Sequence, residues 1–277
     1  MCLMDVLQLP ESTSGMVMLV MTSLGALLLI YLMYQPAPAV ELGEPEPDPP
    51  EPPRNFTKEQ LLEFDGRDDV TPAYIALRNE VFDVSSKPEH YKKDGGYHLF
   101  AGHDASYSLA TGSLDPADLD KSFTELNAME NDALDGWVEK YKHYSGYPVV
   151  GKVVPIPEKL REYSLEDLRP FNGTTEIPEG HAAPPIYVGI KGKASIIVYD
   201  MSYGGAGMYG PGMSYNLFAG RDASVALAKM SFAPEHLDNP DLSILKDSDM
   251  AILQDWADKL AKKYPVVGTI QTRASKS

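Results

Sequence analysis

The 277-residue chain has little cysteine and little positive charge, and each shortage excludes a class of protein. Cys2 is the only cysteine, so the chain can form neither an intrachain disulfide nor a cysteine-based zinc site. Against 40 Asp and Glu stand 24 Lys and Arg, and the formal net charge is −16. Because nucleic acids are bound through a positive surface, we expect no nucleic-acid partner.

Positive charge is missing altogether from residues 1–53, where a long apolar run stands out. Residues 16–34, MVMLVMTSLGALLLIYLMY, carry no charged side chain. As a helix they would extend about 28 Å, close to the roughly 30 Å hydrocarbon core of a bilayer. The alternative is a cleaved secretory signal, but the run is longer than such a core and no positive residue precedes it. We therefore predict a single transmembrane helix at 16–34 within the N-terminal region 1–34. Its orientation is left open, because no Lys or Arg flanks it closely.

Residues 35–53 form a distinct linker, QPAPAVELGEPEPDPPEPP. This segment is rich in proline and acidic residues and has almost no bulky apolar side chain. It cannot bury enough surface to offset its ordering entropy, so we expect an extended, self-repelling spacer. A ligand for a proline-binding domain is the alternative interpretation.

Two later segments of the chain repeat one another. Residues 99–106 read LFAGHDAS and residues 217–224 read LFAGRDAS. Other landmarks keep nearly the same spacing, namely Trp137 with Trp256 and Val149-Val150-Gly151 with Val266-Val267-Gly268. Such a repeat predicts two copies of one α+β domain of about 100 residues, at residues 54–157 and 158–277.

Each copy is expected to contain the same elements in the same order. A capped short helix comes first, then a hairpin, a Gly-rich loop and a helix that carries the Trp. The supporting segments are Thr57-x-x-Gln60 and Ser164-x-x-Asp167 for the caps, 73–77 with 80–84 and 186–190 with 195–200 for the hairpins, and 249–262 for the second Trp helix. The second copy is longer, most simply by an insertion around 175–185.

Together these landmarks resemble the membrane-associated progesterone receptor component family over nearly all of residues 54–270. That family is a haem-binding offshoot of the cytochrome b5 fold, usually with one domain behind one N-terminal membrane span. The resemblance implies an α+β protein with two tandem cytochrome b5-like domains behind a transmembrane helix. Two domains in tandem depart from the common form.

The resemblance also implies how haem would be held. Cytochrome b5 itself uses two His ligands, the first within His-Pro-Gly-Gly, and that tetrapeptide is missing from this chain. The family instead uses a pair of tyrosines six residues apart. By that match Tyr97 and Tyr215 would each bind a ferric, pentacoordinate haem as tyrosinate, and Tyr91 and Tyr209 would lie at the haem edge. Ferric iron can hold a phenol as phenolate, and tyrosine is a known haem ligand. The alternative is that these tyrosines are half-buried anchors of a Gly-rich loop.

A Lys-Tyr pair near the end of the domain lines the haem in the family, and Lys263-Tyr264 matches it in the second copy. The first copy is two residues longer between its Trp and Val-Val-Gly and keeps no clean Lys-Tyr pair. Tyr144 or Tyr147 is the candidate substitute there. We therefore expect the second copy to have the more complete haem motif.

The resemblance implies a function without catalysis. The residues agree with this expectation, because the sequence offers no nucleophile triad, metal-ligand cluster or phosphate loop as an alternative functional site. We expect a membrane-anchored haem-binding protein that carries haem or regulates membrane haem enzymes such as cytochrome P-450. Sterol binding and self-association follow from the family alone. The membrane would be the endoplasmic reticulum or another endomembrane, with the C-terminal domains in the cytosol. The rival hypothesis is a haem-free membrane adaptor, and the missing His pair disfavours an electron-transfer enzyme.

Overall fold

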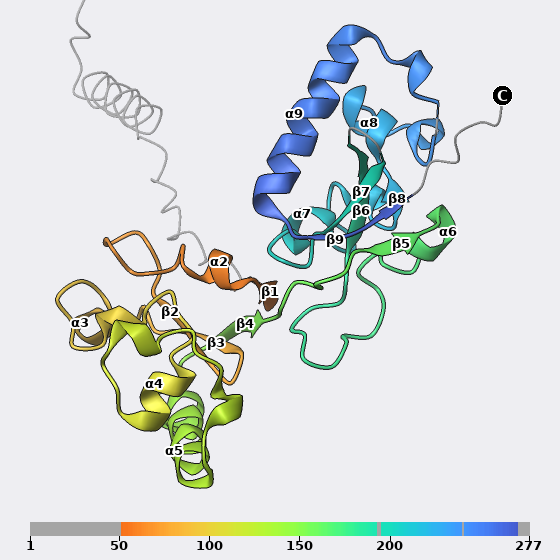
Figure 1. Ribbon diagram of the computed structural model, residues 1–277. Coiled ribbons are helices and arrows are strands. Elements are labelled where there is room, and N and C mark those ends of the chain that lie inside the picture. The colour runs from red at the N-terminus through yellow and green to blue at the C-terminus, as the bar shows by residue number, and fades with distance from the viewer. Residues whose placement is uncertain (1–50, 193–194, 240, 271–277) are drawn as a thin grey trace, which may run out of the picture. The chain divides into compact units, whose positions relative to one another are not determined.

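The computed structural model describes residues 51–192, 195–239 and 241–270 (Figure 1). The predicted span at 16–34 and nearly all of the linker at 35–53 lie outside these residues. Among the helices of the described residues, none is long and apolar enough to cross a bilayer.

The first half of the described chain, residues 51–157, is built on a four-stranded sheet of order β1-β4-β3-β2. Strands β2 and β3 form the predicted hairpin, with β4 antiparallel to β3 and β1 parallel to β4. The two turn residues, Arg78 and Asn79, both have positive φ, at 48° and 64°. A two-residue turn of this kind matches the right-handed twist of the strands. The strands are β1 (Arg54–Phe56), β2 (Tyr74–Leu77), β3 (Glu80–Asp83) and β4 (Val149–Val153).

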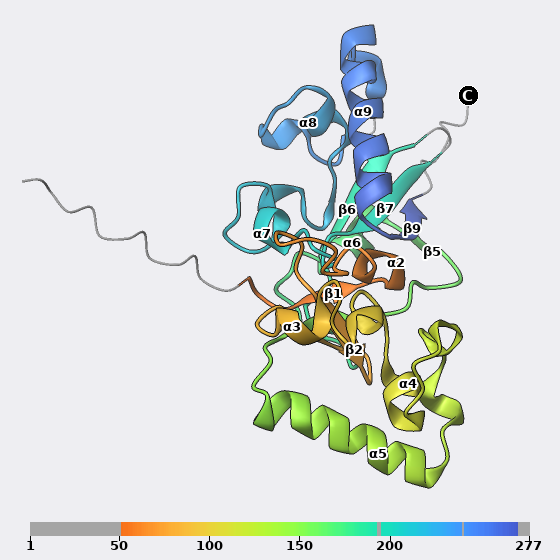
Figure 2. The same cartoon turned by 90° about the vertical axis from the view of Figure 1, so that its left-hand side faces the viewer.

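Short helices cover this sheet, and the longest of them carries Trp137. Helix α4 packs against this Trp helix, α5 (Figures 1 and 2). The helices are α2 (Lys58–Leu61), α3 (Pro88–Tyr91), α4 (Ser106–Thr111) and α5 (Ala128–Glu139), with 3-10 turns at His98–Phe100, Pro116–Asp118 and Phe123–Glu125 and a π-helical turn at Lys140–Tyr144.

The second half, residues 158–270, repeats this topology in a five-stranded sheet of order β5-β9-β7-β6-β8. Its extra strand β8 pairs in parallel with β6, and in the first half an isolated parallel bridge between Ala76 and Asp104 takes that place. Each sheet also has one irregularity at the same point of its central strand, between Val81 and Phe82 or between Val198 and Tyr199. The strands are β5 (Arg161–Tyr163), β6 (Tyr187–Lys191), β7 (Ile196–Asp200), β8 (Arg221–Asp222) and β9 (Val266–Ile270).

The helices of the second half follow the same order, and α8 packs against the Trp helix α9. They are α6 (Leu165–Leu168), α7 (Ala206–Tyr209), α8 (Ser224–Ala228) and α9 (Asp247–Lys263), with 3-10 turns at Asn216–Phe218, Pro234–His236 and Leu242–Ile244. Both capping boxes are present as predicted, at Thr57 with Gln60 and at Ser164 with Asp167. Residues 175–185 contain neither helix nor strand, as expected of an inserted loop.

Each sheet has a hydrophobic core of its own. Ile75, Leu77 and Phe82 are fully buried in the first half, and Val188, Ile190 and Met201 are buried in the second. The α+β class and the repeated topology are therefore as predicted. The organisation as two separate domains stays a prediction.

Candidate functional site

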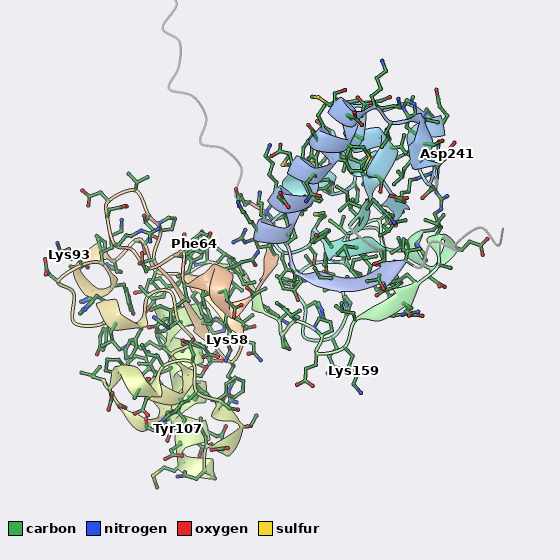
Figure 3. All side chains as sticks on the ribbon, turned by 45° about the horizontal axis from the view of Figure 1, so that its top comes forward. Lys58, Phe64, Lys93, Tyr107, Lys159 and Asp241 are labelled. Atoms are coloured by element: carbon green, nitrogen blue, oxygen red, sulfur yellow. The ribbon has the colours of Figure 1, made fainter. Side chains whose placement is uncertain are left out.

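The predicted tyrosine pairs lie in matching loops of the two halves. In the first half Tyr91 ends α3, and the loop then returns so that the Tyr97 amide donates to the His90 carbonyl at 2.9 Å. Gly95 is required by this return, because a Cβ there would lie 2.3 Å from the His90 oxygen. Figure 3 shows Lys93 on the outer side of the same loop. In the second half the Tyr215 amide donates to the Met208 carbonyl at the same distance.

The rings of each pair are in contact. The centroids of Tyr91 and Tyr97 lie 6.1 Å apart, and those of Tyr209 and Tyr215 lie 5.8 Å apart. The second tyrosine of each pair also stacks on the Phe of the repeated Phe-Ala-Gly sequence, with 5.7 Å between centroids in both halves. The Phe side chains are buried, so they contribute to packing.

Within each pair the two hydroxyls have different surroundings. Tyr91 and Tyr209 are buried, and this burial raises the pKa of both phenols. They are therefore neutral at physiological pH, so they can donate hydrogen bonds. Tyr97 is 38% exposed and Tyr215 is partly exposed. The exposed member of each pair, rather than the buried one, is thus placed to meet a ligand.

A third tyrosine completes each group. Tyr147 lies edge-on to Tyr91 at 6.0 Å, and Tyr264 lies edge-on to Tyr209 at 6.3 Å. Tyr147 is therefore the residue that occupies the Tyr264 position in the first half, whereas Tyr144 is 85% exposed and takes no part. We call Tyr91, Tyr97 and Tyr147 the first tyrosine site. Tyr209, Tyr215 and Tyr264 are the second tyrosine site.

Two features of these sites were not predicted. The Lys263 Nζ lies over the Tyr264 ring, 5.3 Å from its centre. Tyr141 is buried in the first site, and the Tyr91 hydroxyl donates to its hydroxyl at 3.0 Å.

The sequence does contain a signal for Tyr147, because Tyr147-Pro-Val-Val-Gly repeats as Tyr264-Pro-Val-Val-Gly. The π-helical turn at 140–144 takes up the extra length.

A pocket of about 320 Å³ adjoins the first tyrosine site. This volume falls at the lower end of the range typical of small-molecule sites. Basic side chains lie around it alongside aromatic ones. The lining residues are Lys87, His90, Tyr91, Tyr97, Leu109, Trp137, Lys140, Tyr141, Ser145 and Tyr147.

A smaller pocket of different chemistry lies beside Tyr215 in the second half, and its lining shares only three matched positions with that of the first pocket. Its volume is about 90 Å³, and none of the described residues that line it is charged. The lining residues are Tyr215, Phe218, Ala226, Leu227, Met230, Ser231, Phe232 and Trp256.

An aspartate that belongs to none of the repeated motifs fixes the Phe-Ala-Gly-x-Asp loop in each half. Asp120 accepts from the Asp104 amide at 2.9 Å, and Asp238 accepts from the Asp222 amide at 3.0 Å. The other carboxylate oxygen contacts the one residue that differs between the two loops. Asp120 lies 2.7 Å from the His103 ring, and Asp238 lies 3.1 Å from the Arg221 guanidinium.

The residues around the first tyrosine site fit a haem by their chemistry. Among the described residues, no group of three or more His, Cys, Asp or Glu could hold a bare metal ion. A partly exposed phenol beside neutral donors, aromatic walls and basic side chains suits a flat ferric macrocycle with two carboxylates. The family resemblance implies that Tyr97 and Tyr215 would be the residues that hold the iron.

The comparison with known proteins decides the family. The chain is 42% identical over 99 residues to probable steroid-binding protein 3 of Arabidopsis thaliana, a match that spans 36% of this chain and 97% of that protein. The chain belongs to the membrane-associated progesterone receptor component family. With its mixed sheets and helices, the fold is α+β and cytochrome b5-like, which confirms the resemblance.

Two further comparisons cover part of the chain, while no family model matches it. It is 42% identical over 118 residues to membrane steroid-binding protein 1 of Oryza sativa subsp. japonica, a match that spans 43% of this chain and 46% of that protein. The chain thus spans less than half the length of this relative. A solved structure of a hypothetical Arabidopsis thaliana protein, described as having a cytochrome b5 like fold, is 36% identical with a TM-score of 0.34. It is covered completely and covers 41% of this chain.

Proposed function

We propose that this family member binds haem through a tyrosine and catalyses no reaction of its own. The observation that carries the proposal is the half-exposed Tyr97 beside a pocket with both aromatic and basic lining. Bound haem would supply a ferric centre that a hard anionic ligand keeps oxidised, which suits holding or delivering haem better than rapid electron transfer.

Each residue around the first pocket would have its own role in haem binding. Tyr97 would hold the iron as phenolate. Tyr91, whose pKa is raised by burial, keeps its proton and remains a hydrogen-bond donor. The Trp137 and Leu109 side chains exclude water from the pocket, and Lys140 offers a positive charge at its edge.

A haem titration of the full-length chain in detergent tests the proposal. Added haemin should produce a Soret band, and the double variant Tyr97→Phe with Tyr215→Phe should lose it. Tyr144→Phe, at an exposed position outside both sites, is the matched control. If no band appears, or if the double variant keeps an unaltered band, the proposal fails and the haem-free adaptor becomes the better hypothesis.

Steroid binding is a second candidate function, because both curated relatives are named as steroid-binding proteins. The mostly aromatic and aliphatic lining of the first pocket would suit the apolar face of a sterol. A radiolabelled sterol that haemin displaces would support one shared pocket. Retention of sterol by the haemin-saturated chain would show instead that the two ligands bind apart.

We further infer a membrane location, with the described residues on the cytosolic side of the endoplasmic reticulum or another endomembrane. The name of the rice relative and the apolar run at 16–34 support it. The chain should stay in the membrane pellet after alkaline extraction. The Asn172-Gly-Thr sequon should carry no glycan, and a mobility shift after glycan removal would contradict the cytosolic side.

The inferred partners are membrane haem enzymes of the cytochrome P-450 type and a second copy of this chain. Both should be captured more strongly by the haem-loaded chain than by the haem-free chain. Equal capture in both states would favour the adaptor hypothesis.

A further inference from the structure

One position beside the exposed tyrosine differs between the two halves. Phe232 follows the 118-residue spacing of the repeat, and its counterpart is Leu114. The Phe232 ring stacks on Tyr215, with 5.8 Å between centroids and 25° between planes. It also stacks on Phe218, again at 5.8 Å and with 10° between planes.

Tyr215 is therefore contacted by one more ring than Tyr97. Tyr97 meets Tyr91 and Phe100, whereas Tyr215 meets Tyr209, Phe218 and Phe232. A macrocycle needs open space against the tyrosine that binds its iron. Phe232 occupies part of that space at Tyr215, while the Leu114 side chain is 57% exposed and does not line the first pocket.

Phe232 lines the smaller of the two pockets that adjoin the exposed tyrosines. The second pocket, which Phe232 lines, has about 90 Å³ against about 320 Å³ for the first. The first pocket has Lys87 and Lys140 in its lining, which would attract the carboxylates of haem. The described lining of the pocket beside Tyr215 includes no Lys, Arg or His, although Lys259, the counterpart of Lys140, lies over the Trp256 ring at 5.8 Å.

The rim of the second tyrosine site is also apolar. Met208, Met213 and Met230 are each more than 40% exposed around the Tyr215 loop. In the first half His90 stands where Met208 stands in the repeat. The two sites thus keep the same tyrosines but differ in the side chains around the exposed one.

We propose that Phe232 closes the second tyrosine site to haem, so that the chain holds one haem, at Tyr97. This inference rests on the proposed function and names which of its two sites is used. The Lys263-Tyr264 pair indicated the second site as the one with the more complete haem motif, whereas the proposal assigns haem to the first site. We infer that access to the exposed tyrosine decides which site binds haem.

Haem stoichiometry of the full-length chain in detergent tests the proposal, measured as moles of haem per mole of chain after removal of excess haemin. The wild type should retain one haem. Tyr97→Phe should retain close to none, and Tyr215→Phe should still retain one.

A reciprocal exchange of the two residues tests Phe232 itself. Phe232→Leu should raise the stoichiometry to two, and the same change in the Tyr97→Phe background should restore one haem. Leu114→Phe should weaken haemin binding at the first site at least tenfold. Leu160→Phe, at another exposed leucine, is the matched control and should change nothing. Because Leu114 and Phe232 are both largely exposed, circular dichroism should show that these variants fold.

The outcomes separate this inference from the proposed function. No haem on the wild type would refute the proposed function. Two haems on the wild type, or one haem lost with Tyr215→Phe rather than Tyr97→Phe, would overturn the inference and leave haem binding intact. One haem on Phe232→Leu would also overturn it, since Phe232 would then not be the barrier.

Discussion

The Tyr91 hydroxyl donates a hydrogen bond to the Tyr141 hydroxyl at 3.0 Å, and both side chains are buried. Tyr141 lies four residues after Trp137. The residue four positions after Trp256 is Leu260, which is also buried. Tyr141 and Leu260 therefore occupy matching buried positions, four residues after the Trp. Only Tyr141 brings a polar group into the core at this position.

Tyr141→Phe should destabilise the first half by about 1 kcal/mol, because the buried Tyr91 hydroxyl loses one of its two tyrosine hydrogen-bond partners. Denaturant unfolding followed by Trp137 fluorescence, in a Trp256→Phe background, would measure this change. The exposed Tyr144→Phe is the matched control. Equal midpoints for Tyr141→Phe and its parent would show that the hydrogen bond adds nothing to stability.

Much of the fold follows from local sequence signals, and the site follows less completely. The turn residues Arg78 and Asn79 predict the hairpin at 74–83. Each capping box is predicted by two side chains three residues apart. The chain length between Trp137 and Tyr147 was apparent in the sequence, but which tyrosine it places in the site depends on a π-helical turn. The contact of Phe232 with Tyr215 is set by tertiary packing, so no local sequence pattern predicts it.

Two Asp-x-Ser turns should respond to pH in opposite directions. Asp222 and Asp241 each accept from the amide of the Ser two residues later, at 2.9 Å. Burial raises the pKa of Asp222 to about 6, against the hydrogen bonds from Ser224. At the exposed Asp241 the hydrogen bonds from Ser243 lower the pKa (Figure 3).

Between about pH 4 and pH 6 the folded state therefore binds more protons at Asp222 than the unfolded state, and its stability falls as the pH rises. Asp222→Asn should remove this pH-dependent loss of stability and be more stable than wild type at pH 7, by about 3 kcal/mol at most. The advantage should vanish near pH 4. Asp241→Asn should show no such advantage at pH 7, and unfolding curves at pH 4 and pH 7 would compare the two. An Asp222→Asn variant that is no more stable at either pH would contradict the argument.

Asp238 joins three parts of the second half through one carboxylate. Its Oδ2 meets Arg169 at 2.7 Å and Arg221 at 3.1 Å, while Oδ1 accepts from the Asp222 amide. Asp238→Asn keeps the shape and the positive φ of 53° but removes the charge. We expect a loss of about 1 to 2 kcal/mol, because hydrogen bonds to charged groups are the stronger ones. Thermal unfolding would measure it, with Asp255→Asn, from an exposed ion pair, as the control that changes little.

Lys140 should strengthen haem binding through its charge rather than its shape. It lines the first pocket, and its Nζ lies 4.4 Å from the centre of the Trp137 ring. Lys140→Gln keeps most of the side-chain length but removes the positive charge that would face the haem carboxylates. In haemin titrations at low salt we expect a loss of affinity of about fivefold, equivalent to about 1 kcal/mol. Salt should shrink the difference, because it screens charges at an exposed rim.

Lys121→Gln provides the matched control for this measurement. Its Nζ lies over the Tyr107 ring and is paired with Asp118, and it does not line either pocket (Figure 3 labels Tyr107). Its loss should leave haemin affinity unchanged at every salt concentration. If both variants lose affinity equally, the effect comes from the net charge of the chain. If Lys140→Gln loses affinity but salt does not reduce the loss, packing of the side chain against Trp137 is the cause and the charge is not.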